Sequence, residues 1–341
     1  MIDLRSDTVT RPTPAMLEAM MQAKVGDDVF REDPTVQALE EKTARIFGAE
    51  AGLFCPSGTM TNQIAIRAQT QPQQEVICDR NAHIYLYEGG GLAYNSMVSV
   101  RLLSGKRGIL NEEMIEGSIN PDDVHFPSTS LVALENTMNK GGGACYTLHQ
   151  IEAIADVCQK HSLALHLDGA RVFNALVATG NNPSDYGKFF SSISVCLSKG
   201  LGAPVGSVLV GSQDLIKRAR RVRKVFGGGM RQAGYLAAAG IYALDHHVKR
   251  LKEDHQRAKQ LADSLQTRSY VASVLPVETN IVIATLQGIS NPQFLAQLEE
   301  SGVRAVPFGK NDVRFVTHLD FTDEQLDKVV KVFKQMDQQV V

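Results

Sequence analysis

The 341-residue chain has no tryptophan and only five cysteines, each isolated in the sequence. An odd number of cysteines without a CxxC pair argues against a disulfide framework and a cysteine-based zinc site, and it indicates a reducing compartment. No run approaches the roughly 18 apolar residues of a membrane span, and the charged opening MIDLRSDTVTRPTP has no apolar signal-peptide segment. We therefore expect a cytoplasmic protein with no membrane partner.

The chain also has no excess of either charge. Its formal net charge is −2 at pH 7, with 21% charged and 43% hydrophobic residues. This balance argues against a nucleic-acid partner, and the basic run KRARRVRK (217–224) is better explained as a solvated helix face. His246, His247 and His255 have no recognised metal-ligand spacing, so we expect ordinary surface residues there and predict no metal site.

Strand-like and helical segments alternate along most of the chain. Apolar, β-branched runs of strand length occur at 75–78, 97–103, 130–134, 163–168, 193–198 and 207–211. Helical patterns such as 147–162 separate several of them, which predicts an α/β fold with a mostly parallel, doubly wound sheet. Ligands of such sheets bind at the carboxyl ends of the strands.

The composition of the chain and the order of its predicted elements change at about residue 245. A long polar helical pattern (245–266) is followed by a strand-like run, a short helix, the segment VRFVTH and a closing helix. These elements predict a smaller α+β domain. We therefore expect an N-terminal arm (1–14), a large domain (15–245) and a small C-terminal domain (246–341).

Four features could carry chemistry. Lys199 follows the run 193–198, Asp168 ends the run 163–168, CPSGT (55–59) precedes a helical segment, and His83 follows another strand. Each alone has a structural explanation: an exposed lysine, a helix-capping aspartate, an ordinary N-cap and a structural histidine. Together they match the parts that hold pyridoxal phosphate (PLP): a Schiff-base lysine, a carboxylate for the pyridine nitrogen and a helix start for the phosphate.

Two other glycine or serine motifs do not fit. GLGAPVG (200–206) has the spacing GxGxxxG rather than the GxGxxG of a dinucleotide-binding loop. CPSGT does not have the first glycine of the GxSxG nucleophile elbow, which argues against a serine hydrolase.

Seven segments in order carry a resemblance to a known family. They are DLRSDTVTRPT (3–13), GDDVFREDPTV (26–36), PSGTMTNQ (56–63), HLDGARVFNA (166–175), SKGLGAPVGS (198–207), GGGMRQAG (227–234) and VRFVTH (313–318). Along nearly its whole length the chain closely resembles the low-specificity L-threonine aldolases, which are PLP enzymes of the aspartate-aminotransferase-like fold.

The resemblance implies a role for each matching residue. Lys199 would form the Schiff base, Asp168 would pair with the pyridine nitrogen and His83 would stack on the ring. Gly58 and Thr59 would hold the phosphate.

Other residues would serve the substrate. Arg171 would lie by the ring oxygen and the substrate carboxylate, and Ser6 and Arg314 would complete the carboxylate site. His125 corresponds to a second family histidine near the substrate hydroxyl, and Glu88, after YLY, is a further candidate. Arg231 would reach the cofactor pocket of a neighbouring chain, so we expect a homodimer at least, and a homotetramer as the full assembly.

The implied reaction is the reversible aldol cleavage of L-threonine or L-allo-threonine to glycine and acetaldehyde. His83, His125 or a water held by them would take the hydroxyl proton. Two alternatives stay open: another PLP reaction, such as β-elimination or transamination, would share the cofactor residues, and a non-catalytic ligand-binding protein could keep the same fold.

Overall fold

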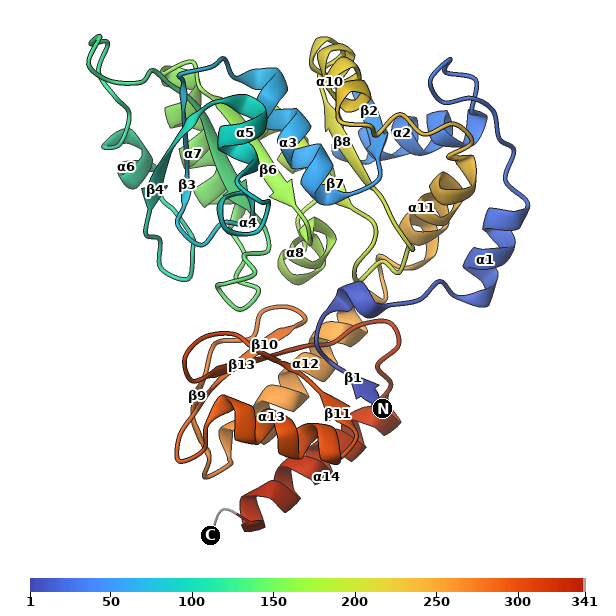
Figure 1. Cartoon of the computed structure of the whole chain (residues 1–341), viewed down its shortest axis with the longest axis vertical. Coiled ribbons are helices and arrows are strands. Elements are labelled where there is room, and N and C mark those ends of the chain that lie inside the picture. Colours follow the sequence, from blue (N-terminus) through green and yellow to red (C-terminus); the bar gives the residue numbers. More distant parts are fainter. Residues whose placement is uncertain (340–341) are drawn as a thin grey trace.

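A seven-stranded sheet forms the centre of the larger part of this computed structural model, which describes residues 1–339 (Figure 1). The strand order is β2-β8-β7-β6-β5-β3-β4. Strand β8 alone runs opposite to the other six strands, so the predicted mostly parallel sheet is confirmed. The strands are β2 (Ala51–Cys55), β3 (Glu75–Asp79), β4 (Ser99–Leu103), β5 (Thr129–Glu135), β6 (Ala164–Gly169), β7 (Ser192–Cys196) and β8 (Ser207–Gly211).

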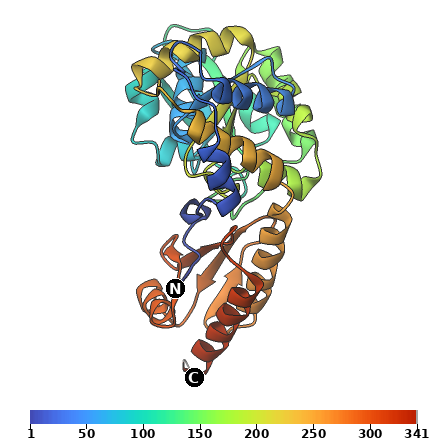
Figure 2. The same ribbon diagram turned by 90° about the vertical axis from the view of Figure 1, so that its right-hand side faces the viewer.

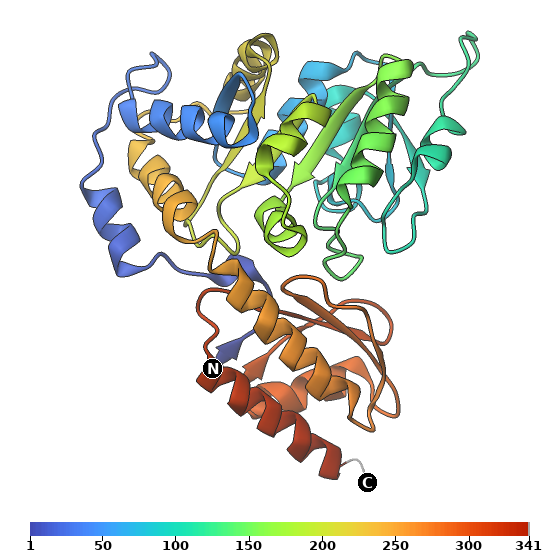
Figure 3. The ribbon, with the colours of Figure 1, turned by 180° about the vertical axis from the view of Figure 1, so that it is seen from behind.

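Helices cover both faces of this sheet, as Figures 1 and 3 show from opposite sides. One face carries α3 (Gly58–Gln69), α4 (His83–Leu86), α5 (Gly91–Ser96) and α10 (Gln213–Val225). The other carries α2 (Pro34–Phe47), α7 (Leu148–Lys160), α9 (Pro183–Phe189) and α11 (Gly234–His246), which share the largest apolar core. The remaining helices here are α1 (Pro14–Met21), α6 (Glu112–Glu116) and α8 (Val172–Thr179).

Local signals explain where several helices begin and end. Helix α2 starts at the N-cap Asp33 with proline in its first turn, and it ends at Gly48, whose φ of 66° is left-handed. Helix α7 starts with a capping box between Thr147 and Gln150. These caps satisfy first-turn N–H groups that have no partner inside the helix.

The C-terminal part has its own sheet and core (Figure 2). Its strand order is β12-β13-β10-β9, all antiparallel. The N-terminal strand β1 (Ile2–Asp3) pairs with β11 (Val303–Arg304) of this part before the chain crosses to the larger part. The other elements are β9 (Val271–Val274), β10 (Ile281–Leu286), β12 (Val306–Pro307), β13 (Asp312–Val316), α12 (Leu251–Gln266), α13 (Asn291–Glu300) and α14 (Asp323–Gln339). The exact domain boundaries stay a prediction.

The structure differs from the sequence-based expectations at three points. Strand β2 was not expected, because AGLFC is short and has no β-branched residue. The helical pattern 245–266 is broken between α11 and α12. At this break His247 is buried and bonds through Nδ1 to the Leu201 carbonyl oxygen (2.7 Å), so the expectation of a surface residue was wrong.

None of the helices described within residues 1–339 has both the length and the apolar composition needed to span a membrane.

Candidate active site

Two carboxylates lie side by side where β5 and β6 end. Glu135 and Asp168 are register neighbours on these parallel strands, and both side chains are buried. Asp168 accepts hydrogen bonds from Asn62 Nδ2 (3.0 Å) and from the backbone N–H of Ala170 (3.1 Å). The strand-end position expected for Asp168 is therefore confirmed, and its carboxylate is aimed by a side chain of α3.

His83 begins α4 at the same end of the sheet. Its backbone N–H donates to Glu135 Oε2 (2.7 Å), and its ring Nδ1 lies 3.1 Å from Glu88 Oε1. Glu88 also accepts from Asn62 Nδ2 (2.9 Å) and Gln63 Nε2 (2.6 Å). Because an ionised carboxylate only accepts, Nδ1 of His83 carries the hydrogen and Nε2 is left with the lone pair.

The buried side-chain amide of Asn62 links the carboxylates of Asp168 and Glu88. Its Nδ2 donates to Asp168 and Glu88, so its Oδ1 is free to accept from His166 Nε2 at 3.1 Å. Burial lowers the pKa of His166 to about 4, which keeps this ring neutral at pH 7. The neutral histidine thereby fixes the orientation of Asn62.

Charge is concentrated in this cluster. One ligand atom each of His83, Glu88 and Asp168 lies within 4.8 Å of the others. Burial and the charge of Asp168 raise the pKa of Glu135 to about 7. Burial opposes the charged form of His83, but the Glu88 hydrogen bond and the charge of Asp168 outweigh it and raise the His83 pKa above its usual value.

Lys199 follows β7, and its side chain is partly buried. Its backbone carbonyl accepts from Thr10 Oγ1 (3.0 Å). The glycines after it shape a tight return into β8: Gly206 has a φ of 110°, and a Cβ there would lie 2.5 Å from the ring of Phe54. This loop therefore turns the chain back beside the lysine.

The start of α3 forms a cradle for an anion. Ser57 caps the helix by accepting from the N–H of Met60 (3.2 Å), and Gly58 and Thr59 follow in its first turn. Ser207 Oγ is buried without a partner within the described chain, and a Cβ on Gly58 would lie 3.4 Å from it. Free first-turn N–H groups and an unpaired hydroxyl suit a phosphate, so this feature fits PLP.

The two arginines expected at the substrate carboxylate have different partners. Arg171 is buried and pairs with Asp7. Arg314, on β13, donates to Asn139 Oδ1 (2.9 Å) and to the Arg5 carbonyl (3.0 Å), and its Nε has no partner among the described residues. Burial and the charge of Arg171 lower the pKa of Arg314 to about 10.

The remaining expected residues lie in different places. Ser6 caps the 3₁₀ turn Asp7–Val9, with its Oγ 2.9 Å from Thr8 Oγ1. Arg231 is exposed and pairs with Asp27 at 2.9 Å. His125 has a side chain that is 81% exposed, and its loop leads into the amino end of β5, opposite the strand ends that carry Asp168. Within one chain, the structure does not bring His125 to His83.

Sequence reasoning missed three residues of this site: Asp7, Asn62 and Glu135. Glu135 could have been found, because a carboxylate directly follows the expected strand 130–134, as Asp168 ends 163–168. Asn62 lies in the first turns of the helix that starts at Gly58, so helical spacing could have pointed to it. Asp7 carries no local signal, because its partners are far away in the sequence.

Comparisons with known proteins identify the family of this chain. Residues 3–288 match the family described as beta-eliminating lyase. The chain is 45% identical over 333 residues to the low specificity L-threonine aldolase of Escherichia coli K12, covering 96% of this chain and 97% of that protein. It is 41% identical to low-specificity L-threonine aldolase 1 of Arabidopsis thaliana, covering 98% and 96%.

Solved structures show the same fold at low sequence identity. The threonine aldolase of Leishmania major matches with a TM-score of 0.86 at 21% identity, covering 99% of this chain and all of the other. The aspartate aminotransferase of Rhizobium meliloti matches with a TM-score of 0.72 at 16% identity, covering 99% and 91%. The expected aspartate-aminotransferase-like fold is thus confirmed. Together with the full-length sequence similarity, this shows that the chain belongs to the low-specificity L-threonine aldolases of the beta-eliminating lyase family.

Proposed function

We propose that this protein is a carbon–carbon lyase that cleaves L-threonine and L-allo-threonine reversibly to glycine and acetaldehyde, with PLP as its cofactor. The observation that carries the proposal is Arg314, a partly buried guanidinium with only neutral hydrogen-bond partners. One of these partners, Asn139, donates its backbone N–H to Glu135, which is the register neighbour of Asp168. An arginine without a counter-ion suits the carboxylate of an amino acid. Other β-hydroxy-α-amino acids share the groups that this site recognises.

The residues present would hold PLP at three points. Lys199 would bind its aldehyde, Asp168 would keep its pyridine nitrogen protonated, and the α3 start at Gly58 and Thr59 would bind its phosphate, with His83 against the ring. When bound, PLP supplies an electron sink for the bond that breaks at the substrate Cα.

The chain's own residues would then direct the cleavage. Arg314, with Ser6 and Arg171 beside it, would orient the substrate carboxylate and so select which bond at Cα breaks. His83 Nε2 would accept the β-hydroxyl proton, since Glu88 holds the opposite nitrogen and favours the protonated ring that results.

We also propose that the working unit is at least a homodimer, with a homotetramer as the full assembly. Segment 228–231 packs against segment 27–30, where Asp28 N–H donates to the Arg231 carbonyl (3.1 Å). Phe30 and Val225, near this contact, are 70% and 83% exposed. Large exposed apolar side chains beside an exposed arginine suit a second copy of the chain, whose cofactor site Arg231 would reach.

Four buried free thiols support the cytoplasm as its compartment: Cys55, Cys78, Cys158 and Cys196.

Product analysis tests the reaction. Purified protein with PLP and L-threonine is expected to release glycine and acetaldehyde in equal amounts. A keto acid in place of acetaldehyde would indicate elimination or transamination, and binding without products would indicate a ligand-binding protein. Borohydride reduction followed by peptide mapping is expected to label Lys199, and a label on another lysine would contradict the cofactor assignment.

A further inference from the structure

Asp7 joins three separate segments of the chain around one buried carboxylate. It lies in the N-terminal arm and is fully buried. Its two oxygens accept from Arg171 Nε (2.8 Å) and Nη2 (2.7 Å), and Oδ2 also accepts from Asn280 Nδ2 (3.1 Å). Arg171 belongs to the larger part and Asn280 to the C-terminal part, so Asp7 lies where both parts meet the arm.

In this arrangement Arg171 has a carboxylate counter-ion, whereas Arg314 has none among the described residues. Asp7 neutralises Arg171 through a bidentate pair, which occupies one whole edge of its guanidinium. Arg314 forms no ion pair among the described residues. Lys140, which lies with Arg314 beside the ring of Phe308, is partly exposed, so water screens its charge.

We propose that Asp7 makes the site selective for amino acids that carry a single carboxylate. The proposal rests on the proposed function, because it assumes that Arg314 binds the substrate's α-carboxylate. Asp7 already occupies the Nε–Nη2 edge of Arg171, so this edge cannot form a bidentate pair with a second carboxylate on the substrate side chain. A dicarboxylic amino acid would therefore lose water from its second charge without gaining an ion pair.

A matched pair of ligands tests this selectivity. L-Alanine and L-aspartate have no β-hydroxyl group, so neither can undergo aldol cleavage, and they differ by one carboxylate on Cβ. Their dissociation constants are measured from the absorption change of the bound cofactor, and their inhibition constants are measured against threonine cleavage. The wild type is expected to bind aspartate at least about tenfold more weakly than alanine, the scale of one unpaired charge in a protein site.

The variant Asp7→Asn removes the charge and keeps the size and one acceptor oxygen. It is expected to shift the affinity ratio toward aspartate by about tenfold or more, because close charge pairs couple with at least that factor. In Asp7→Asn/Arg171→Gln the freed guanidinium is gone, so the gain for aspartate is expected to disappear.

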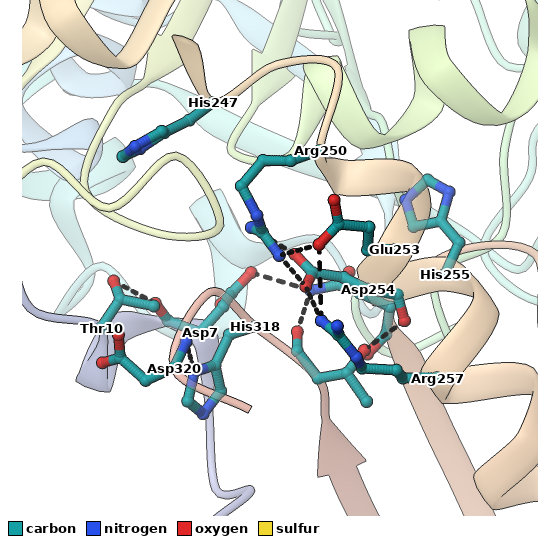
Figure 4. Close-up of polar contacts among 12 residues, drawn as sticks. Asp7, Thr10, His247, Arg250, Glu253, Asp254, His255, Arg257, His318 and Asp320 are labelled. Atoms are coloured by element: carbon teal, nitrogen blue, oxygen red, sulfur yellow. Dashed lines mark hydrogen bonds and ion pairs between the residues drawn. The ribbon is translucent and has the colours of Figure 1, made fainter. Parts of the chain in front are cut away.

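Asp254→Asn provides the matched control. Asp254 is also fully buried near the junction of the two parts and pairs with Arg250 (2.5 Å), as Figure 4 shows. It contacts neither Arg171 nor Arg314, so this variant can lose stability but is expected to keep the wild-type ratio.

Two outcomes overturn the proposal: a wild type that binds aspartate as tightly as alanine, and a folded Asp7→Asn variant with an unchanged ratio. The first needs no variant, so it holds even if Asp7→Asn does not fold. Failure of the proposed function has a different signature, since a wild type that releases no acetaldehyde from threonine still reports both dissociation constants through the cofactor absorption.

Discussion

Replacing Arg314 by lysine keeps a positive charge in the site but removes the planar fork that matches a carboxylate. In the structure, Nη1 and Nη2 each already donate to one neutral oxygen, and Nε is buried without a partner in the described chain. The remaining N–H groups of Arg314 can therefore donate two hydrogen bonds to one carboxylate. A lysine ammonium at this position acts as a point charge. Losing one charge-assisted hydrogen bond costs about 1.5–3 kcal/mol, or about 10- to 150-fold in affinity.

The same environment adds a pH dependence to the variant. Burial and Arg171 lower the pKa of Arg314 to about 10, which leaves the wild-type guanidinium charged throughout the neutral range. A lysine begins from a pKa of about 10.4 and would meet the same burial and the same neighbour. It would lose its charge closer to neutral pH, so threonine binding by Arg314→Lys should weaken as the pH rises, while the wild type should stay nearly constant.

The assay is threonine cleavage followed through acetaldehyde with a coupled dehydrogenase, at several pH values. The apparent KM is expected to rise about 10- to 150-fold, with the absorption of the bound cofactor unchanged. Arg304→Lys is the control, because Arg304 is a partly exposed arginine of the same part that pairs with Glu299. Threonine saturation that is equal in Arg314→Lys and the wild type would refute the carboxylate role of Arg314.

Three further predictions follow from the rest of the site. Asp168→Asn should retain the cofactor and lose about 10²–10³ in kcat, as when a preorganised charge contact is removed; near-normal turnover would contradict its role at the pyridine nitrogen. Glu88→Gln removes a group that raises the pKa of His83, so more of this ring is neutral at low pH and the acid limb of kcat/KM should move to lower pH; an unmoved limb would exclude His83 as the base. Mixing inactive Arg231→Ala and Lys199→Ala chains should restore part of the activity if sites are shared between copies, and a fully active monomer by light scattering would rule this out.

Much of the fold follows from local patterns. Residue period and composition predicted six strands of the central sheet, the helix between residues 147 and 162, and the α+β character of the C-terminal part. Strand β2 was missed because a five-residue segment with glycine and cysteine is read as a strand only when its neighbour β8 is known. The strand ends also placed Asp168 and Lys199 at one edge of the sheet, since parallel strands end together.

The sequence by itself determined these elements and, through its motifs, the family and the residues that would hold the cofactor. Only the tertiary structure decided how the charges are paired. Asp7 meets Arg171 and Asn280 across 164 and 273 positions of the chain, and Arg314 meets Asn139 across 175. No residue period encodes such contacts, because they arise when the packing of two sheets and an N-terminal arm brings distant side chains together. That packing buries Arg171 with its own carboxylate and leaves Arg314 with neutral hydrogen-bond partners only.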